Sequence, residues 1–168
     1  MPDSVEEGTI VGMTEHIDFL QLRDFAVSTA TRAAELIAAR RAELVAGDGI
    51  AAHTSTKSSD VDPVTEVDTA TEEFIATTIR TQRPGDGIFG EEGANVESTS
   101  GVTWIVDPID GTVNFLYGVP DFAVSIGAEY QGRLVAGAVV NVARGRTYAA
   151  AAGQGATVTG PDGKVHPL

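Results

Sequence analysis

The first half of the chain carries apolar residues at helical spacing. Between His16 and Ala46 they recur near every 3.6 residues, which predicts one long helix that the Gly-Asp-Gly run at 47–49 ends. A second helix is predicted to begin at Thr65, because Thr65-Glu66-Val67-Asp68 is a capping box that follows a proline. The expected buried stripes are Leu22, Phe25, Ala26, Thr29, Ala33, Leu36, Ile37 and Leu44 in the first helix, and Val67, Thr71, Phe74, Ile75, Thr78 and Ile79 in the second.

The rest of the chain changes to short apolar runs bounded by turn residues, which are typical of strands. Two such runs, Gly87–Gly90 and Thr103–Val106, are predicted to be buried strands. A meander of five strands is predicted after them, at Phe122–Tyr130, Leu134–Val142, Arg146–Ala152, Ala156–Thr159 and Lys164–His166. Helices followed by consecutive strands predict an α+β fold, in which two helices pack on an antiparallel sheet.

Composition and charge narrow the possible functions. With 24 acidic and 11 basic residues the formal net charge is -13, which argues against binding to nucleic acid or to an anionic membrane surface. The chain has no cysteine and therefore no thiol chemistry. It has no apolar run of about 20 residues that would span a bilayer, and its acidic start does not resemble a signal peptide. We expect a cytoplasmic α+β domain over residues 15–168, preceded by a disordered leader at 1–14.

Acidic side chains follow two of the predicted strands. Asp107 ends an apolar run, and Asp110 comes three residues later in the sequence Asp-Pro-Ile-Asp-Gly-Thr. Glu91 and Glu92 follow the strand that ends at Gly90. Carboxylates held this close repel one another unless they are protonated or bridged by a cation. The motif is also typical of a strand that exits into a turn with Asp110 as a helix N-cap, so both interpretations stand at this point.

The available ligands favour a hard cation. Oxygen ligands without His or Cys suit Mg²⁺, Mn²⁺ or Ca²⁺. The run Asp60–Val64 does not fit an EF-hand loop, because Val64 occupies the third ligand position. The sequence contains no Gly-Lys-[Ser/Thr] run, which excludes a P-loop NTPase. The residues Asp110-Gly111-Thr112 can open a turn whose backbone N–H groups face an anion.

These motifs resemble the inositol monophosphatase family of Mg²⁺-dependent, lithium-sensitive phosphatases, and within it the bacterial inositol-1-monophosphatases. The resemblance covers about residues 20–168. It implies the metal- and phosphate-binding N-terminal half of that fold. The residues that carry it are Lys57-Ser58-Ser59, Asp62–Asp68, Gly90–Gly93, Trp104–Thr112, Asn114-Phe115 and Ala123–Gly127.

The resemblance implies a set of metal ligands. Two or three Mg²⁺ ions are expected, with Mn²⁺ as a substitute. Glu91, Asp107 and the carbonyl of Ile109 would hold the first ion. Asp107 would bridge to a second ion, which Asp110 also binds. Glu91 would in addition help to place a third, weaker ion and the attacking water.

The resemblance also implies the catalytic and substrate-binding residues. Thr112, hydrogen-bonded to Asp68, would activate the attacking water. The N–H groups of Gly111 and Thr112, next to Asp110, would receive the phosphate group. Without the resemblance, Asp68 would be read as an acidic residue favoured in the first turn of a helix.

Two features depart from the family pattern. Val113 stands where the family usually carries a second threonine. The family's second α/β half contains a Trp-Asp-x-Ala-Ala-Gly element whose Asp binds the second metal, but here the only tryptophan, Trp104, is followed by Ile105. The second ion would then have only Asp107 and Asp110 as protein ligands. We expect the 168-residue chain to bind that ion weakly and to turn over slowly or not at all.

Other polar residues are interpreted as structural or solvent-facing. The run Glu66–Glu73, apart from Asp68, is expected to be a solvated helix face. The remaining residues expected at the surface are Lys57, His16, His53 and His166.

The resulting hypothesis is Mg²⁺-dependent hydrolysis of inositol 1-phosphate to inositol and phosphate. A first alternative is another phosphatase of the superfamily, acting on fructose bisphosphate, adenosine bisphosphate or histidinol phosphate. A second alternative is a non-catalytic regulatory or interaction module. The resemblance implies a homodimer that takes a small phosphate ester, with no nucleic-acid or membrane partner.

Overall fold

The computed structural model describes residues 17–46 and 63–168. The described elements are α1 (Phe19–Ala46), α3 (Pro63–Gln82), β1 (Gly87–Gly90), β2 (Asn95–Val96), β3 (Val102–Asp110), α4 (Thr112–Tyr117), β4 (Ala123–Tyr130), β5 (Arg133–Asn141), β6 (Arg146–Ala151), β7 (Gly155–Thr159) and β8 (Val165–Pro167). The predicted leader at 1–14, the helix stop at 47–49, Lys57, His16 and His53 lie outside the described residues. Among the described helices, none combines the length and the apolar character needed to cross a membrane.

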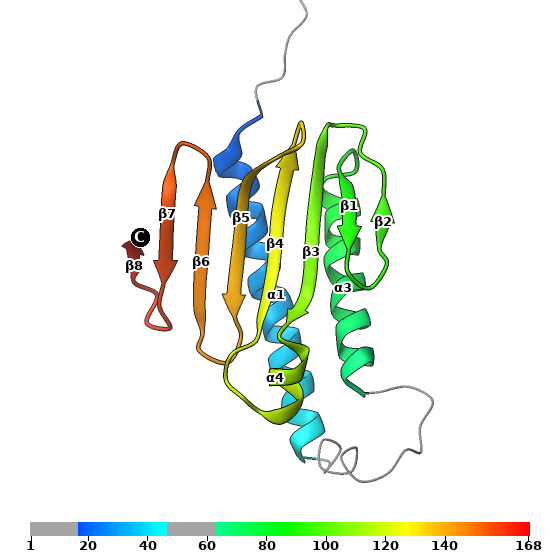
Figure 1. Cartoon of the computed structure of the whole chain (residues 1–168), viewed down its shortest axis with the longest axis vertical. Helices are drawn as coiled ribbons and strands as arrows, with labels where there is room; N and C mark the ends of the chain where they lie inside the picture. The colour runs from blue at the N-terminus through cyan, green and yellow to red at the C-terminus, as the bar shows by residue number, and fades with distance from the viewer. Residues whose placement is uncertain (1–16, 47–62) are drawn as a thin grey trace, which may run out of the picture.

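The strands form one sheet in the order β2-β1-β3-β4-β5-β6-β7-β8 (Figure 1). The α+β class predicted from the sequence is confirmed, but the prediction of a purely antiparallel sheet is wrong at one place. β1 and β3 run parallel, with Ile88 opposite Trp104. After β1 the chain returns as β2 along the outer edge, so it enters β3 from the same end at which β1 began. The sheet is therefore mixed.

Both long helices pack on the same face of this sheet. α1 crosses β4, β5 and β6, and α3 lies against β1 and β3; Figure 1 shows the two helices side by side behind the strands. In the described part of the chain no helix covers the opposite face, which we call the open face. Phe89, Ile105, Leu134, Val139 and Tyr148 are the large apolar side chains exposed on strands β1, β3, β5 and β6.

Small side chains bring α1 close to the sheet. Ala26, Ala30 and Ala33 are fully buried on the helix face that Leu22 and Ile37 complete. Strand β5, on which α1 packs, also carries buried alanines, among them Ala138. Close approach of the two backbones increases the number of van der Waals contacts per residue. The predicted stripes hold for both helices, except that Phe25, Leu36, Leu44 and Phe74 are only half-buried.

The helix starts differ from the prediction. Asp18 caps α1, because its Oδ1 accepts the N–H of Leu20 at 2.9 Å. α3 begins at Pro63 and not at Thr65. Proline is favoured in the first turn because it has no N–H that needs an acceptor there and its φ angle already suits a helix. Thr65 therefore lies inside the first turn and does not cap it.

β3 extends further than the sequence predicted. The predicted strand ended at Val106, whereas β3 continues to Asp110. Its pairing with β4 becomes irregular between Asp107 and Asp110. Pro108 lies inside this irregular stretch, where the hydrogen bonds between β3 and β4 do not require a backbone N–H donor. The acidic motif is therefore held by the end of a strand and not by a free loop.

The predicted hairpins of the meander are confirmed within one or two residues at each end. The clearest is the turn between β4 and β5, where Gln131 and Gly132 both have positive φ, 52° and 74°. Two such residues match the right-handed twist of the joined strands. His166 is exposed in β8, as expected.

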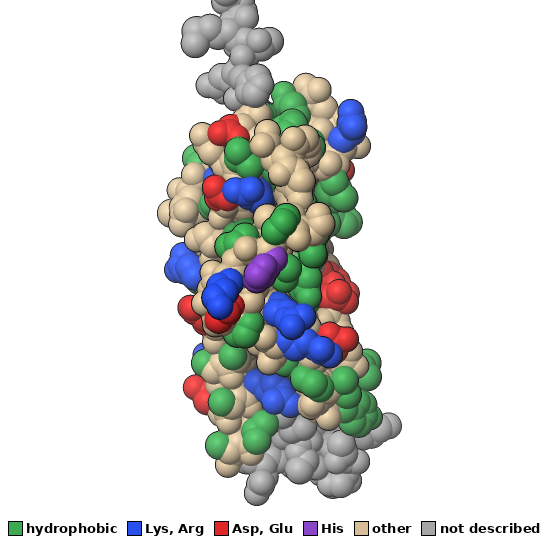
Figure 2. Space-filling view, turned by 90° about the vertical axis from the view of Figure 1, so that its left-hand side faces the viewer, with side chains coloured by type: hydrophobic (Ala, Val, Ile, Leu, Met, Phe, Trp, Pro, Cys, Tyr) green, Lys and Arg blue, Asp and Glu red, His purple; other side chains and the backbone are tan. Residues whose placement is uncertain are grey.

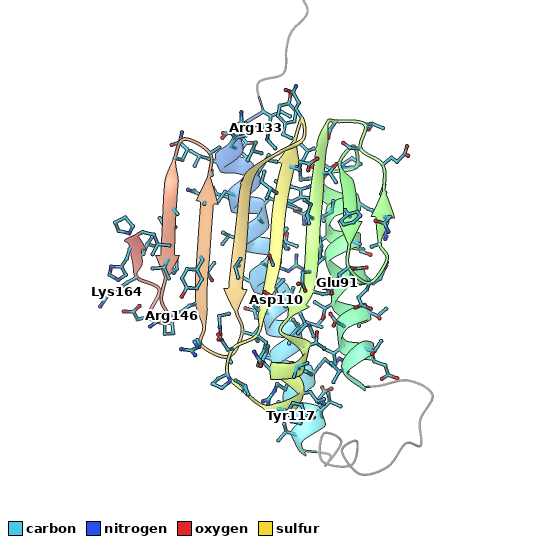
Figure 3. All side chains as sticks on the ribbon, viewed as in Figure 1. Glu91, Asp110, Tyr117, Arg133, Arg146 and Lys164 are labelled. Carbon is cyan, nitrogen blue, oxygen red and sulfur yellow. The ribbon has the colours of Figure 1, made fainter. Side chains whose placement is uncertain are left out.

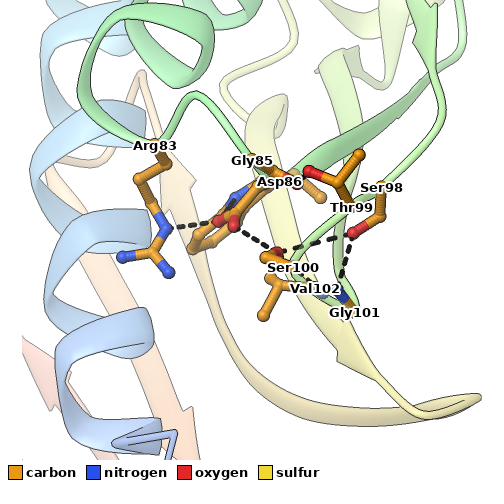
Figure 4. A network of polar contacts seen from close by, with 9 residues as sticks. Arg83, Gly85, Asp86, Ser98, Thr99, Ser100, Gly101 and Val102 are labelled. Carbon is orange, nitrogen blue, oxygen red and sulfur yellow. Dashed lines mark hydrogen bonds and ion pairs between the residues drawn. The ribbon is translucent and has the colours of Figure 1, made fainter. Parts of the chain in front are cut away.

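A buried carboxylate fixes the junction between α3, β1 and β3 (Figure 4). Asp86 accepts hydrogen bonds from Trp104 Nε1 at 2.8 Å and Ser100 Oγ at 2.6 Å, and it forms an ion pair with Arg83. The Arg83 guanidinium lies 5.7 Å from the centre of the Trp104 ring. The buried polar atoms of this cluster thus all have hydrogen-bond or ion-pair partners. This favours a structural role for Asp86.

Candidate active site

The predicted site residues come together at one end of the sheet. Asp107 and Asp110 lie on the last residues of β3, and Glu91 directly follows β1. The N–H of Glu91 donates to the carbonyl of Val106 at 3.1 Å, which continues the parallel pairing of β1 and β3 into the acidic turn. Figure 3 shows Glu91 and Asp110 near the lower ends of their strands. Asp68 comes from the N-terminal part of α3.

Asp68 is a buried carboxylate with an unpaired oxygen. Its side chain is only 6% exposed, and Oδ1 has no hydrogen-bond partner. Burial raises the pKa of Asp68 to about 7, and the negative charges of Glu92, Asp107, Glu91 and Glu72 add to this effect. At neutral pH such a group needs a proton or a nearby cation to be stable.

Asp107 has the same two properties. Its Oδ1 is buried and unpaired, although the residue as a whole is half-buried. Burial, a side-chain hydrogen bond with Glu91, and the charges of Glu91 and Asp110 raise the pKa of Asp107 to about 7. A hydrogen bond from the Ile109 backbone acts in the opposite direction. Glu91 and Asp110 are exposed to solvent.

These carboxylates fit a divalent cation in their chemistry. Two buried oxygens without a hydrogen bond, and two mutually repelling acids with raised pKa values, are stabilised by a positive charge. The ligands present are all oxygen atoms, which suits Mg²⁺ or Mn²⁺. As the described side chains are placed, no three acidic or imidazole groups converge closely enough to enclose an ion between them. Ligation by all the predicted residues therefore needs side-chain movements, and Glu91 and Asp110 are the solvent-exposed members of this set.

Thr112 differs from its expected arrangement. Its hydroxyl donates to the Ile109 carbonyl at 3.0 Å, and no hydrogen bond to Asp68 is formed among the described side chains. The reason is local, because Thr112 is the first residue of α4 and its side chain turns back to the carbonyl three residues earlier. The predicted ligand carbonyl of Ile109 thus already has one partner.

Gly111 directly precedes α4, and the backbone conformation at this position requires a glycine. Its φ is 90°, in the left-handed region, and a Cβ there would lie 3.0 Å from the carbonyl of Asp121. Asn114 supports the same loop by donating to that carbonyl at 2.7 Å. The predicted N-cap role of Asp110 is not found, since Gly111 occupies the cap position without a side-chain hydrogen bond. Asp110 is free to take part in the site.

The sequence interpretation missed Glu72. It was assigned to a solvated helix face, yet the side chain is only 4% exposed. Its two carboxylate oxygens accept the N–H groups of Glu92 and Ala94, each at 2.8 Å. A Cβ on Gly90 would collide with this carboxylate. Glu72 therefore holds the turn that presents Glu91.

A signal for Glu72 was present in the sequence. Asp68 and Glu72 are four residues apart, so they lie on the same face of α3. The glycine before Glu91 is a typical sign of close approach by another group.

A polar cleft opens beside Asp110 and Gly111. Its volume is about 480 Å³. Arg144 and Arg146, in and next to the turn that joins β5 and β6, also line it, and the sequence interpretation did not single them out. The lining residues important below are Asp110, Gly111, Asn141, Arg144, Arg146 and Tyr148; we call this space the arginine cleft.

Comparisons with known proteins show which proteins this chain is similar to. The inositol-1-monophosphatase of Mycobacterium bovis is 50% identical over 153 residues, which are 86% of this chain and 52% of that protein. The solved structure of Mycobacterium tuberculosis SuhB superposes with a TM-score of 0.74 at 44% identity, covering 91% of this chain and 53% of that one. The histidinol-phosphatase of Chlorobaculum parvum is 44% identical over 101 residues, or 60% of this chain and 39% of that protein.

The chain thus spans about half the length of the relatives that it matches. The sequence profile of the inositol monophosphatase family matches residues 18–168, which includes every site residue discussed above. On this match, and on the 50% identity to a bacterial member, the chain belongs to the inositol monophosphatase family.

Proposed function

We propose that this chain forms the metal- and phosphate-binding part of a phosphatase that hydrolyses a phosphomonoester. One observation carries the proposal: Asp68 and Asp107 each hold a buried oxygen without a hydrogen bond, next to the acidic turn of Glu91. A pair of buried, mutually repelling carboxylates costs stability, and a divalent cation removes this cost. Membership of the family supports the same conclusion.

Each site residue has a role in this proposal. Glu91, Asp107, Asp110 and the Ile109 carbonyl hold Mg²⁺ ions, two or three in number, for which Mn²⁺ can substitute. Such ions would neutralise the negative charge of the phosphoryl group and make a bound water molecule more acidic. Glu72 orients Glu91 through the turn that it binds.

The reaction itself needs positioning more than covalent chemistry. Asp68 and Thr112 orient a water molecule, with help from Glu91. The N–H groups of Gly111 and Thr112, beside Asp110, hold the phosphate oxygens. Water attacks phosphorus and loses a proton, the bond to the alcohol oxygen breaks, and that oxygen leaves with the proton as the free alcohol. Positioning and charge neutralisation account for most of the catalysis of phosphoryl transfer.

Inositol 1-phosphate is the first substrate that we propose, since several bacterial relatives carry the name inositol-1-monophosphatase. Histidinol phosphate is a second candidate, which the relative from Chlorobaculum parvum supports. We expect the 168-residue chain alone to turn over either ester slowly, because Asp107 and Asp110 are the only side chains proposed for the second ion.

A metal titration followed by a phosphate-release assay tests the proposal. Millimolar Mg²⁺ is expected to raise the melting temperature of the purified chain, and Asp107→Asn is expected to abolish that rise. Inorganic phosphate released from inositol 1-phosphate and from histidinol phosphate then ranks the substrates. An unchanged melting temperature with Mg²⁺ would favour a non-catalytic interaction module. Phosphate release at a rate typical of the longer relatives would contradict the expected impairment.

We further propose that the chain forms a homodimer. Phe89 and Leu134 support this, because they are exposed on the open face, do not line the arginine cleft, and exposed apolar patches mark interaction surfaces. Light scattering is expected to give twice the mass of 17.4 kDa, and a monomer at micromolar concentration would contradict it. A cytoplasmic location stays a prediction from the sequence.

A further inference from the structure

The register of the sheet aligns the proposed phosphate site with Arg146, one of the two basic residues of the arginine cleft. Asp110 pairs with Ala123, Ala123 with Asn141, and Asn141 with Arg146. These four residues form one row across β3, β4, β5 and β6. Side chains in such a row point to the same face, and three strand spacings place the Cα atoms of Asp110 and Arg146 about 14 Å apart. Figure 3 shows both residues toward the lower end of the sheet.

The two arginines keep hydrogen-bonding capacity for a ligand. Arg146 forms no hydrogen bond or ion pair with the other described residues. Arg144 donates from Nε to the Pro120 carbonyl at 3.0 Å and lies 3.8 Å from Asp121, which leaves both of its terminal nitrogens without a described partner. Asp121 in turn accepts a hydrogen bond from Asn141 at 3.0 Å. The loop therefore fixes the stem of Arg144 and leaves the end of its guanidinium group available.

The charge distribution favours an anion at this end of the cleft. The chain has a net charge of -13 and only 11 basic residues, so two neighbouring arginines are a local exception. Figure 2, which faces the side of the sheet that β7 and β8 form, shows Lys and Arg side chains over its lower half, with acidic side chains among them. Arginine is suited to phosphate because its planar group donates two parallel hydrogen bonds.

An apolar wall of the cleft suits a ring. Tyr148 pairs with Val139 across β5 and β6, and both side chains are partly exposed on the open face. Tyr148 lies two residues from Arg146 on the same strand, so the two side chains share a face. An apolar wall beside the row that joins Asp110 to Arg146 fits a compact cyclic spacer that carries two phosphate groups.

We infer that the arginine cleft is a subsite for the second phosphate of a bisphosphate substrate, bound by Arg144 and Arg146 while the first phosphate occupies the Asp110–Thr112 loop. This inference rests on the proposed function for the position of the reacting phosphate. It adds a preference for esters in which a ring carries a second phosphate on the far side from the scissile bond.

Binding of a matched pair of non-hydrolysable probes tests the inference. The probes are benzylphosphonate and 1,4-phenylenebis(methylphosphonate), which differ by one phosphonate group across a ring. Isothermal titration calorimetry is carried out on the full chain with millimolar Mg²⁺. We expect the bisphosphonate to bind at least tenfold more tightly. We expect the Arg144→Ala/Arg146→Ala variant to lose this preference while its affinity for the monophosphonate changes by less than twofold.

Two controls make the result specific. Arg133→Ala removes an exposed arginine at the opposite end of the sheet (Figure 3) and is expected to keep the full preference. Arg146→Lys keeps the charge and is expected to retain part of it. Melting temperatures within 2 °C of the unchanged chain, an order expected for surface substitutions, verify that the variants fold.

The outcomes separate the inference from the proposed function. Equal affinity for the two probes, or a preference that survives the double substitution, would overturn the inference and leave the proposed phosphatase intact. Failure of both probes to bind in the presence of Mg²⁺ would overturn both.

Discussion

The carboxylate of Glu72 on α3 accepts the backbone N–H of Glu92 at 2.8 Å, in the turn that presents Glu91 to the candidate metal site. The second oxygen of Glu72 accepts the N–H of Ala94, so both ends of the turn are bound to the helix. The close approach requires glycine at position 90. This buried acid links the packing of α3 to the position of a proposed ligand.

Glu72→Gln is therefore expected to weaken Mg²⁺ binding. One acceptor oxygen is replaced by an NH₂ group that faces a backbone donor, and the turn loses a fixed orientation. Residues that orient metal ligands typically contribute about 10- to 100-fold in affinity, and we expect a loss in that range. The measurement is the Mg²⁺ concentration that gives half of the rise in melting temperature.

The neighbouring Glu73 provides a matched control. Its carboxylate is exposed, and its partners among the described residues are Thr77 and Arg80 on the helix surface. Glu73→Gln is expected to leave the Mg²⁺ dependence unchanged. A similar loss in both variants would show that Glu72 acts through helix stability and not through the turn.

The raised pKa values of Asp68 and Asp107 predict an unusual pH dependence of stability. Both carboxyls have a pKa of about 7 in the folded chain, against 3.8 as the ordinary value. Between about pH 4 and 7 the folded state therefore binds more protons than the unfolded state. By linkage, the free energy of unfolding of the metal-free chain decreases as pH rises through this range and then levels off.

The measurement is the melting temperature in a chelating buffer at pH values from 5 to 8. Asp107→Asn is expected to flatten this pH dependence and to raise the melting temperature at pH 8, because it removes one of the repelling charges. Mg²⁺ is expected to stabilise the unchanged chain more at pH 8 than at pH 5. A metal-free chain that becomes more stable from pH 5 to pH 8 would contradict the raised pKa values.

The cluster around Asp86 is expected to matter for stability and not for metal binding. Asp86→Ala leaves Trp104 Nε1 and the partly buried Arg83 without their acceptor, and the desolvation cost of such orphaned groups is about 1–3 kcal/mol each. We expect the free energy of unfolding to decrease by about 2–4 kcal/mol. Chemical denaturation measures this change.

Asp162→Ala is the matched control for that experiment. Asp162 pairs with Lys164 at 3.3 Å, but both side chains are largely exposed. Exposed ion pairs contribute about 0–1 kcal/mol. Comparable destabilisation by the two substitutions would mean that the buried position of Asp86 has no special importance.

Local patterns predicted much of the fold. The helical stripe of α1 depends on residues three and four apart, and Gln131-Gly132 carries its turn preference in two residues. The parallel pairing of β1 with β3 was not predicted, because it depends on where the chain re-enters the sheet after β2. β2 itself has two residues, too few for a periodic pattern.

The candidate site divides in the same way. Asp107, Asp110 and Glu91 follow apolar runs, and their position was visible in the sequence. Glu72 was missed because its burial depends on a turn some twenty residues later in the chain. The arginines of the cleft were missed for a similar reason, since only the register of four strands aligns Arg146 with Asp110.

The central claim is that Asp107 and Glu91 share a divalent cation. A crystal of this chain grown with Mn²⁺, with data collected to measure anomalous scattering, tests it most directly. We expect an anomalous peak within ligand distance, about 2.0–2.6 Å, of carboxylate oxygens from both residues. Well-ordered Asp107 and Glu91 side chains with no peak between them, at millimolar Mn²⁺, would contradict the claim.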